Sequence, residues 1–364
     1  MNRVRKSILL FLCTFSIFTL TACDKDKPVE LPNLDINQPF TDVKIDDNTD
    51  IIVEDNSDEF NKEEGKIAEL SDPIEVNFID VGQGDSCFIV TANNDTILID
   101  AGEKSDALAI IECLDEYEFE DIDLMILTHP DADHIAGAKT ILETYDVAEV
   151  VMCSYVKNTK MFENLIACLE NLDTKVTQGQ VGLEYNIDGV NLLVVGVDSN
   201  VKTANDSSVV TKMTYGDVSI MFMGDLEEKG EKVVLQNGYD LSAQIMKLGH
   251  HGSSTSSSQE MLDVVNPKIA IISCGLDNKY GHPHVETKDK LDTMGIKYYR
   301  TDELGTIKLE IDGINITTIL NDSLNMNQML ASRNFLFSPD VASVEIVPET
   351  EVLVNLELAE SKVE

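Results

Sequence analysis

Thr128-His129-Pro130-Asp131-Ala132-Asp133-His134 gathers four good metal ligands into six residues. The run follows an apolar segment, Ile122–Leu127, with the length and composition of a buried strand. Two imidazoles and two carboxylates at the end of a strand can surround one point, and zinc and manganese accept both kinds of donor. The alternative is a solvated acidic turn, but two of only six histidines fall in this run. The run therefore predicts a site for one or two divalent ions.

The other four histidines also form pairs after predicted strands. His250 and His251 follow the apolar residues 245–248 and precede a glycine turn. His282 and His284 lie in a Gly/Pro loop after a strand predicted at 268–274. Core histidines with satisfied hydrogen bonds are the alternative, yet packing explains three loop-borne pairs poorly. We therefore expect these loops to contribute to the same centre.

Gly224-Asp225 ends another apolar strand, predicted at 218–223. A carboxylate that leaves a buried strand at a glycine can bridge two ions, whereas the alternative is an aspartate that caps the next helix. Ser253 and Ser254 form either a plain polar loop or a helix start that presents hydroxyl and N–H groups to an anion.

Residues 73–320 contain short apolar strands and helix-like segments. Strands are predicted at 74–80, 85–91 and 96–100, helices at 103–118, 134–145 and 158–171, and further strands from 190 onward, after a polar interval. The chain twice shows the same order, a meander of strands followed by strands that alternate with helices. This order predicts an α+β fold, an αββα sandwich of two packed mixed sheets with helices outside.

The N-terminus predicts a targeting segment. Basic residues at positions 3–6 precede an apolar run at 7–20, and Leu20-Thr21-Ala22-Cys23 ends it with small residues. This ending resembles the lipobox of bacterial lipoproteins, which implies a signal peptide over 1–22 and a lipid on Cys23. A plain signal peptide or an uncleaved anchor is the alternative. The expected location is the bacterial cell surface, on the outer face of the cytoplasmic membrane.

The segment after the lipobox is strongly acidic. Residues 24–72 carry sixteen Asp and Glu against five Lys, which predicts a disordered, self-repelling tether over 23–72. Residues 321–364 form an extension for which the sequence indicates no role. The net charge of the 364-residue chain is −39, and this disfavours a stable basic surface for nucleic acid. The sequence indicates no oligomeric state.

The motifs together resemble the metallo-β-lactamase-fold hydrolases, in the branch of the extracellular C-terminal domain of ComEC-type competence proteins. The resemblance covers about residues 74–320, and its segments appear in the family's order. They are Phe78–Ser86, Leu98–Gly102, Thr128–His134, Gly224-Asp225, Lys247–Ser254, Tyr280–Pro283 and Arg300–Asp302. The family's transmembrane channel has no counterpart in this sequence.

The resemblance implies a centre of two divalent ions, Zn²⁺ or Mn²⁺. The first ion would take His129 and Asp131, the second would take Asp133, His134 and His251, and Asp225 would bridge them. Asp100 would orient a metal-bound histidine from behind.

Two positions depart from the family pattern. Asp131 stands where a histidine is usual, and Asn205 stands near the place of another histidine. Both changes put an oxygen donor where an imidazole nitrogen is usual. The first site therefore offers harder ligands, which favours manganese as a competitor of zinc. His250 would face the substrate, although His250 and His251 could exchange roles.

The resemblance also implies groups that act on the substrate. Asp133 or His250 would carry a proton, and His282 would contact metal or substrate. The expected contacts to a phosphate are Lys247, Lys279, Ser253, Ser254 and Arg300, although each cation has the alternative of a solvated surface charge. The residues expected at the rim of the pocket are Asp80, Gln83 and Asp85.

The first functional hypothesis is a surface-anchored phosphodiesterase or nuclease that uses a metal-bound hydroxide. Residues 73–320 hold 42 Asp and Glu against 17 Lys and Arg, and this excess of negative charge disfavours binding of DNA. A small diester or a wall polymer, as in phosphorylcholine esterases, is therefore a rival. Two different classes of protein are also weighed, a β-lactamase or lactonase and a non-catalytic binding protein.

Overall fold

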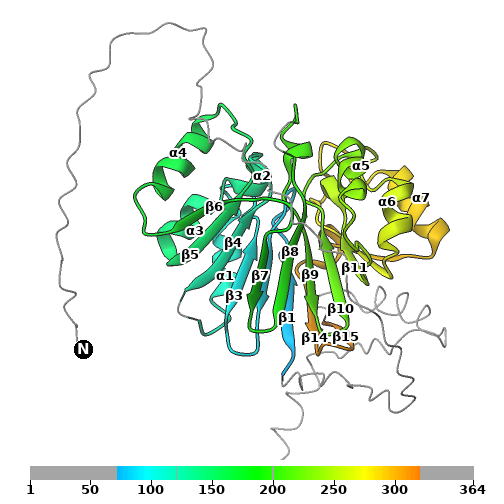
Figure 1. Ribbon diagram of the computed structural model, residues 1–364, viewed down its shortest axis with the longest axis horizontal. Coiled ribbons are helices and arrows are strands. Elements are labelled where there is room, and N and C mark those ends of the chain that lie inside the picture. Colours follow the sequence, from blue (N-terminus) through cyan, green and yellow to red (C-terminus); the bar gives the residue numbers. More distant parts are fainter. Residues whose placement is uncertain (1–71, 120, 199–200, 320–364) are drawn as a thin grey trace, which may run out of the picture. The chain divides into compact units, whose positions relative to one another are not determined.

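The computed structural model describes residues 72–119, 121–198 and 201–319. The predicted signal peptide, the predicted lipid attachment at Cys23, the tether up to residue 71 and the extension at 321–364 lie outside these residues. Two β-sheets make up the centre of the described part (Figure 1).

The first sheet has eight strands in the order β15-β14-β1-β2-β3-β4-β5-β6. The strands are β1 (Ile74–Phe78), β2 (Cys87–Val90), β3 (Thr96–Ile99), β4 (Ile122–Leu127), β5 (Val147–Met152), β6 (Lys175–Gln178), β14 (Ile307–Ile311) and β15 (Ile316–Ile319). Strands β3 to β6 run parallel to one another, whereas β2, β1, β14 and β15 pair in antiparallel fashion.

The second sheet has seven strands in the order β13-β12-β11-β10-β9-β8-β7. The strands are β7 (Glu184–Ile187), β8 (Val190–Gly196), β9 (Val210–Tyr215), β10 (Val218–Phe222), β11 (Ile245–Lys247), β12 (Ile269–Ile272) and β13 (Lys297–Arg300). Strands β10 to β13 are parallel, and β7, β8 and β9 form an antiparallel meander.

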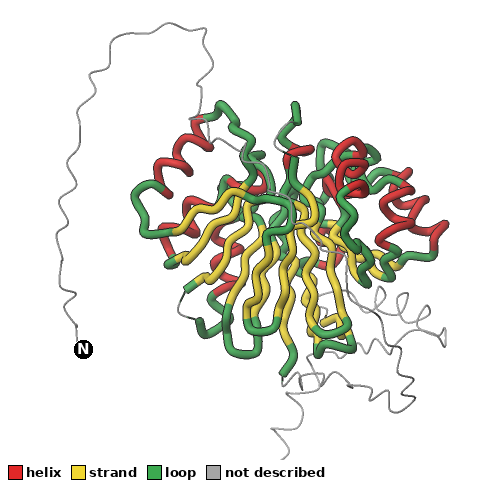
Figure 2. Tube along the Cα trace, viewed as in Figure 1, coloured by secondary structure: helices red, strands yellow, loops and turns green. Residues whose placement is uncertain are grey.

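Helices lie on the outer faces of the two sheets (Figure 2). Those that pack on the first sheet are α1 (Ala107–Leu114), α3 (Ala138–Thr144) and α4 (Lys160–Leu169). Those that pack on the second are α5 (Glu228–Gln236), α6 (Gln259–Val265) and α7 (Val285–Met294). Short helical turns occupy loops: α2 (Ala132–Ile135), η1 (Asn205–Ser207), η2 (Gly249–Gly252) and α8 (Thr301–Leu304). Among the described residues, no helix combines the length and apolar character needed to cross a membrane.

Burial on both faces of the sheets explains the continuous apolar strands of the sequence. In β4, Leu124 and Ile126 enter the core between the sheets, while Met125 and Leu127 pack under the outer helices. Between the sheets, the rings of Phe78 and Phe222 stack with centroids 6.0 Å apart. Such strands lack polar alternation because neither face meets water. The predicted αββα sandwich is confirmed.

Three strands and one helix boundary differ from the sequence prediction. Strands β5, β6 and β7 were not predicted, and the predicted helix at 134–145 is divided into α2 and α3. The break lies at Gly137, where a Cβ atom would stand 2.0 Å from the carbonyl oxygen of Ala101. The chain must come this close because the N–H of Gly137 donates to the carbonyl of Gly102.

The topology brings the predicted motifs to one edge. Because β3 and β4 are parallel in one sheet and β10 to β12 are parallel in the other, the loops after these strands carry the polar residues of the motifs. The carboxyl ends of parallel strands are a common place for binding sites.

Candidate metal centre

The loop between β4 and α2 places two histidines side by side. His129 directly follows Thr128 at the end of β4, and His134 lies within α2. Their ring centroids are 4.1 Å apart, and both side chains are buried. The short helical turn returns the chain toward the strand end, so the local sequence brings these two histidines together.

A glycine lets Asp225 approach these rings. Gly224 has φ +54°, and a Cβ atom there would stand 2.9 Å from the hydroxyl of Ser208. The N–H of Asp225 donates to the same hydroxyl over 3.1 Å. Glycine therefore allows β10 to end in a tight turn that directs the carboxylate inward.

The second histidine pair has an unusual backbone. His250 and His251 have φ values of +51° and +54°, in the left-handed region that costs about 1–3 kcal/mol per non-glycine residue. The N–H of His250 donates to the carbonyl of Gly224 over 3.1 Å, and this bond ties the two loops together. The turn presents His251 to the interior and leaves His250 at the solvent side, 24% exposed.

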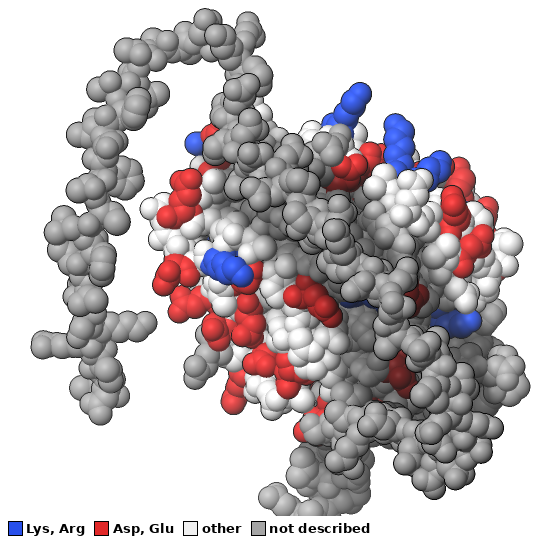
Figure 3. Space-filling view, in the orientation of Figure 1, with Lys and Arg blue, Asp and Glu red and all other residues white. Residues whose placement is uncertain are grey.

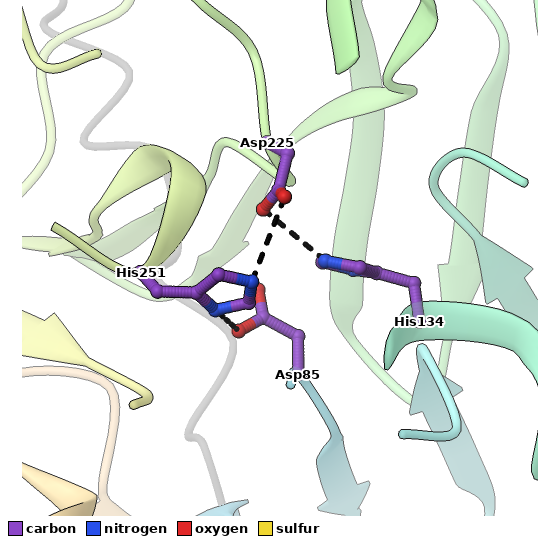
Figure 4. A group of neighbouring side chains, drawn as sticks. All are labelled: Asp85, His134, Asp225 and His251. Atoms are coloured by element: carbon purple, nitrogen blue, oxygen red, sulfur yellow. Dashed lines mark ion pairs between the residues drawn. The ribbon is translucent and has the colours of Figure 1, made fainter. Parts of the chain in front are cut away.

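Four buried side chains from distant parts of the chain meet at one point (Figure 4). One ligand atom from each of Asp85, His134, Asp225 and His251 lies within 4.8 Å of the others. The His134 Nε2 is 3.2 Å from Asp225 Oδ1, and the His251 Nε2 is 3.5 Å from Asp225 Oδ2. The His129 Nε2 lies 3.7 Å from Asp225 Oδ2, on the same carboxylate.

Hydrogen bonds behind the rings fix which nitrogen faces the centre. The Nδ1–H of His134 donates to Asp100 Oδ2 over 2.7 Å, and that of His251 donates to the carbonyl of Ser273 over 3.1 Å. His129 Nδ1 bonds to the Thr128 hydroxyl, which itself donates to Asp100. Asp100 therefore orients one histidine directly and a second through Thr128, as expected for metal ligands.

The donors that face the centre fit a divalent cation. The Nε2 atoms of His129, His134 and His251 and the Oδ1 atom of Asp225 are buried and lack a hydrogen-bond partner among the described residues. Unpaired buried polar atoms are costly, so four of them in one place indicate a group that satisfies them together. Imidazole nitrogens with carboxylate oxygens suit zinc, manganese or iron.

The electrostatics of the centre are those of tightly coupled charges. Burial disfavours charge on His251, but the carboxylates of Asp225 and Asp85 outweigh it and raise the pKa of His251 to about 10. Burial is likewise outweighed at His134, whose pKa lies well above its ordinary value because of Asp225 and Asp100. Burial, with a contribution from His134, lowers the pKa of His129 to about 4. A metal ion must therefore displace protons from His134 and His251.

The other predicted ligands lie around this group. Asp133 Oδ2 is 3.3 Å from His251 Nε2 with a quarter of its side chain exposed. Asp131 instead pairs with Lys157, whose Nζ is 2.7 Å from Asp131 Oδ1. Asn205, in η1, places its amide nitrogen 3.5 Å from both ring nitrogens of His250.

His250 and His282 face each other at the edge of the centre. Their ring centroids are 5.3 Å apart, and His282 Nδ1 is 3.4 Å from the amide nitrogen of Gln83. His250 Nε2 is 3.8 Å from Asp225 Oδ2, and its Nδ1 is 3.5 Å from Glu227. The role of His250 toward a substrate stays a prediction.

The sequence placed Asp85 at the rim and Lys247 on the substrate, whereas the structure joins the two. Lys247 Nζ is 2.6 Å from Asp85 Oδ2, and both side chains are buried. The other oxygen of Asp85 is 3.2 Å from His251 Nδ1. The available signal was an aspartate after Gly82-Gln83-Gly84, a turn in which a Cβ atom on Gly84 would stand 2.5 Å from the carbonyl of Asp133.

The remaining predicted substrate contacts have partners within the chain. Arg300 binds both oxygens of Asp302, over 3.0 and 2.6 Å, and also contacts Glu303. The Ser253 hydroxyl is 3.0 Å from that of Thr255, and the N–H of Ser254 donates to His284 Nδ1 over 2.9 Å. A role on a phosphate remains a prediction for each of them.

The comparisons with known proteins agree with this geometry. The sequence profile of the metallo-beta-lactamase superfamily matches residues 79–276. The chain belongs to that superfamily. This member of a hydrolase family is 31% identical over 257 residues to ComE operon protein 3 of Bacillus subtilis (strain 168). The match covers 66% of the chain and 33% of that protein. It is also 30% identical over 233 residues to Competence protein ComA of Neisseria gonorrhoeae, and this match covers 63% of the chain and 31% of that protein.

The resemblance of this metallo-β-lactamase-superfamily chain to the ComEC branch is thus confirmed. The chain spans about a third of the length of these curated relatives. The crystal structure of the metallo-beta-lactamase fold protein YhfI from Bacillus subtilis aligns with a TM-score of 0.42 and 12% identity, over 63% of this chain and 96% of that one.

Proposed function

We propose that this protein is a metal-dependent phosphodiesterase of the bacterial cell surface. The proposal rests on the convergence of three imidazole Nε2 atoms with Asp225 Oδ1, all of them buried and without a hydrogen-bond partner among the described residues. When bound there, Zn²⁺ or Mn²⁺ acts as a Lewis acid and lowers the pKa of water toward neutrality. Similarity to proteins named for competence supports a phosphodiester as the substrate.

The protein's own groups divide the proton transfers of such a hydrolysis. His134 and His251 would hold the ion, and the bonds of their Nδ1 atoms to Asp100 and Ser273 leave Nε2 of each ring free for it. Asp133 is partly exposed beside His251, so its carboxylate is placed to take a proton from the attacking water. His250, on the solvent side of Asp225, is placed to give a proton to the departing alkoxide.

The charge of the surface bears on the substrate. Acidic side chains are scattered over the described part of the face in Figure 3, and the basic ones stand singly or in small groups, not in a continuous stripe. A long nucleic acid needs such a stripe for static binding. Residues 73–320 also hold 42 Asp and Glu against 17 Lys and Arg, so a short DNA end or a small or wall-polymer diester, held locally at the centre, is favoured.

The test uses the full chain, stripped of metal with a chelator and reloaded with Zn²⁺ or Mn²⁺. Hydrolysis of bis-p-nitrophenyl phosphate and of single- and double-stranded DNA would be measured for wild type and for Asp225→Asn. Asp263→Asn, an exposed aspartate on α6, is the matched control. We expect metal-dependent turnover that Asp225→Asn abolishes and Asp263→Asn retains.

Two results would overturn the proposal. One is the absence of diester turnover in the loaded protein. The other is faster hydrolysis of a chromogenic β-lactam or of p-nitrophenylphosphorylcholine than of any nucleotide diester, since either would assign a different ester or amide as substrate. Turnover of a small diester without DNA cleavage would retain the phosphodiesterase and exclude the nuclease.

The cell-surface location rests on the lipobox-like ending at Cys23. We expect the wild-type protein to fractionate with membranes and to incorporate labelled palmitate, and Cys23→Ser to lose the label. Equal labelling of both proteins would contradict lipid attachment at this residue.

A further inference from the structure

Asp131, the expected ligand of the first ion, is bound to a lysine. Lys157 lies in the loop between β5 and α4, and its Nζ stands 2.7 Å from Asp131 Oδ1. About a third of each side chain is exposed, so the pair lies where the centre meets solvent. A protonated amine has three donors and no lone pair, so it occupies the carboxylate without being able to coordinate a metal.

The rest of the expected first position is also incomplete. Asn205 lies 3.5 Å from His250 and offers a neutral amide in place of an imidazole, so it adds no charge to a second cation site. Of that position, His129 is the member that reaches the Asp225 carboxylate, over 3.7 Å. The compact group of four ligands, by contrast, contains neither Asp131 nor Asn205.

We infer that the protein holds one divalent ion tightly, at a group that contains His134, Asp225 and His251, and that Lys157 occupies Asp131 in place of a second ion. The inference rests on the proposed metal-dependent function and narrows it to a centre with one high-affinity position. The ammonium neutralises the one carboxylate of the first position that is not shared with the four-ligand group. It also places a positive charge where a second cation would have to approach.

Counting bound ions in the full chain tests the inference without reference to turnover. Stripped protein would be equilibrated with increasing free Zn²⁺ or Mn²⁺, and metal per chain would be measured by mass spectrometry. We expect one equivalent in wild type and a second equivalent in Lys157→Met, with an affinity for that second ion raised on the order of tenfold or more. The matched control is Lys160→Met, three residues along, whose pair with Glu163 at 3.2 Å is exposed.

Each of the remaining outcomes is decisive. Two ions of similar affinity in wild type, or one ion in both wild type and Lys157→Met with an unchanged circular dichroism spectrum, would overturn the inference. A second ion in Lys160→Met would also overturn it, because the effect would then come from lowering the positive charge nearby. A change from one ion to two in Lys157→Met without any phosphodiester turnover would sustain the inference and refute the proposed function.

Discussion

The buried pair of Lys247 and Asp85 gives a sharp energetic prediction. Lys247 ends β11 and Asp85 precedes β2, so the pair joins the two sheets beneath the metal centre. At 2.6 Å the attraction is about 6 kcal/mol for an effective dielectric constant of about 20, before the cost of removing both charges from water. Their side chains are only 5% and 8% exposed, so removal of the lysine leaves a charge that water cannot solvate.

We expect Lys247→Met to lower the free energy of unfolding by about 3–5 kcal/mol. With a urea dependence of about 2–3 kcal/mol per molar for a domain of this size, the midpoint falls by about 1–2.5 M. Lys247→Met/Asp85→Leu should recover most of this loss, because a buried ion pair replaced by apolar groups of similar size is close to neutral. Lys232→Met, which breaks the exposed pair with Glu228 in α5, should leave the midpoint almost unchanged.

The assay is urea denaturation of the chelator-treated full chain at pH 7, followed by circular dichroism. Burial raises the pKa of Asp85, but Lys247 and His251 outweigh it, so the net shift is downward. The carboxylate therefore contributes its stability above the ordinary aspartate pKa and loses it only as acid protonates the folded form. A midpoint shift for Lys247→Met as small as that of Lys232→Met would refute the reasoning.

Three further predictions concern the centre and its support. Asp100→Asn should weaken metal binding by about 10–100-fold because it loosens His134, and calorimetric titration with an unchanged dissociation constant would contradict this. Metal binding should release protons and tighten from pH 6 to pH 8, because the raised pKa values of His134 and His251 keep both imidazoles protonated until a metal replaces the proton. Calorimetric titrations in buffers of different ionisation enthalpy measure this proton release. Metal binding without proton release would count against these two ligands. Gly137→Ala should lower the unfolding free energy by at least about 1–3 kcal/mol, because its Cβ would stand 2.0 Å from the carbonyl oxygen of Ala101, and a wild-type melting temperature would show that the loop can relax.

Much of the fold follows from patterns that burial imposes on the sequence. Strand β4 is apolar throughout because it is covered on both faces, so the sequence predicted it with its observed bounds. Strands β6 and β7 are largely exposed and carry no apolar pattern, so pairing with their neighbours forms them. Strand β5 did carry a pattern in Val147, Val150 and Val151, but an intervening glutamate obscured it.

The site divides in a similar way between local and long-range information. The positions of His129 and His134 follow from seven consecutive residues, because a strand end and one helical turn suffice to bring them together. The contact of Asp85 with Lys247 joins residues 162 apart in sequence, and that of Asp131 with Lys157 joins residues 26 apart. No local spacing encodes such pairs, so a charge expected to meet the substrate was found to neutralise a carboxylate beside the metal ligands.

X-ray absorption spectroscopy at the edge of the metal bound to the full chain identifies its ligands. We expect imidazole scattering from at least His134 and His251, with one imidazole lost in His251→Ala and none lost in His284→Ala, whose Nδ1 instead accepts the N–H of Ser254. A coordination shell without imidazole, or one that His251→Ala leaves unchanged, would contradict this expectation.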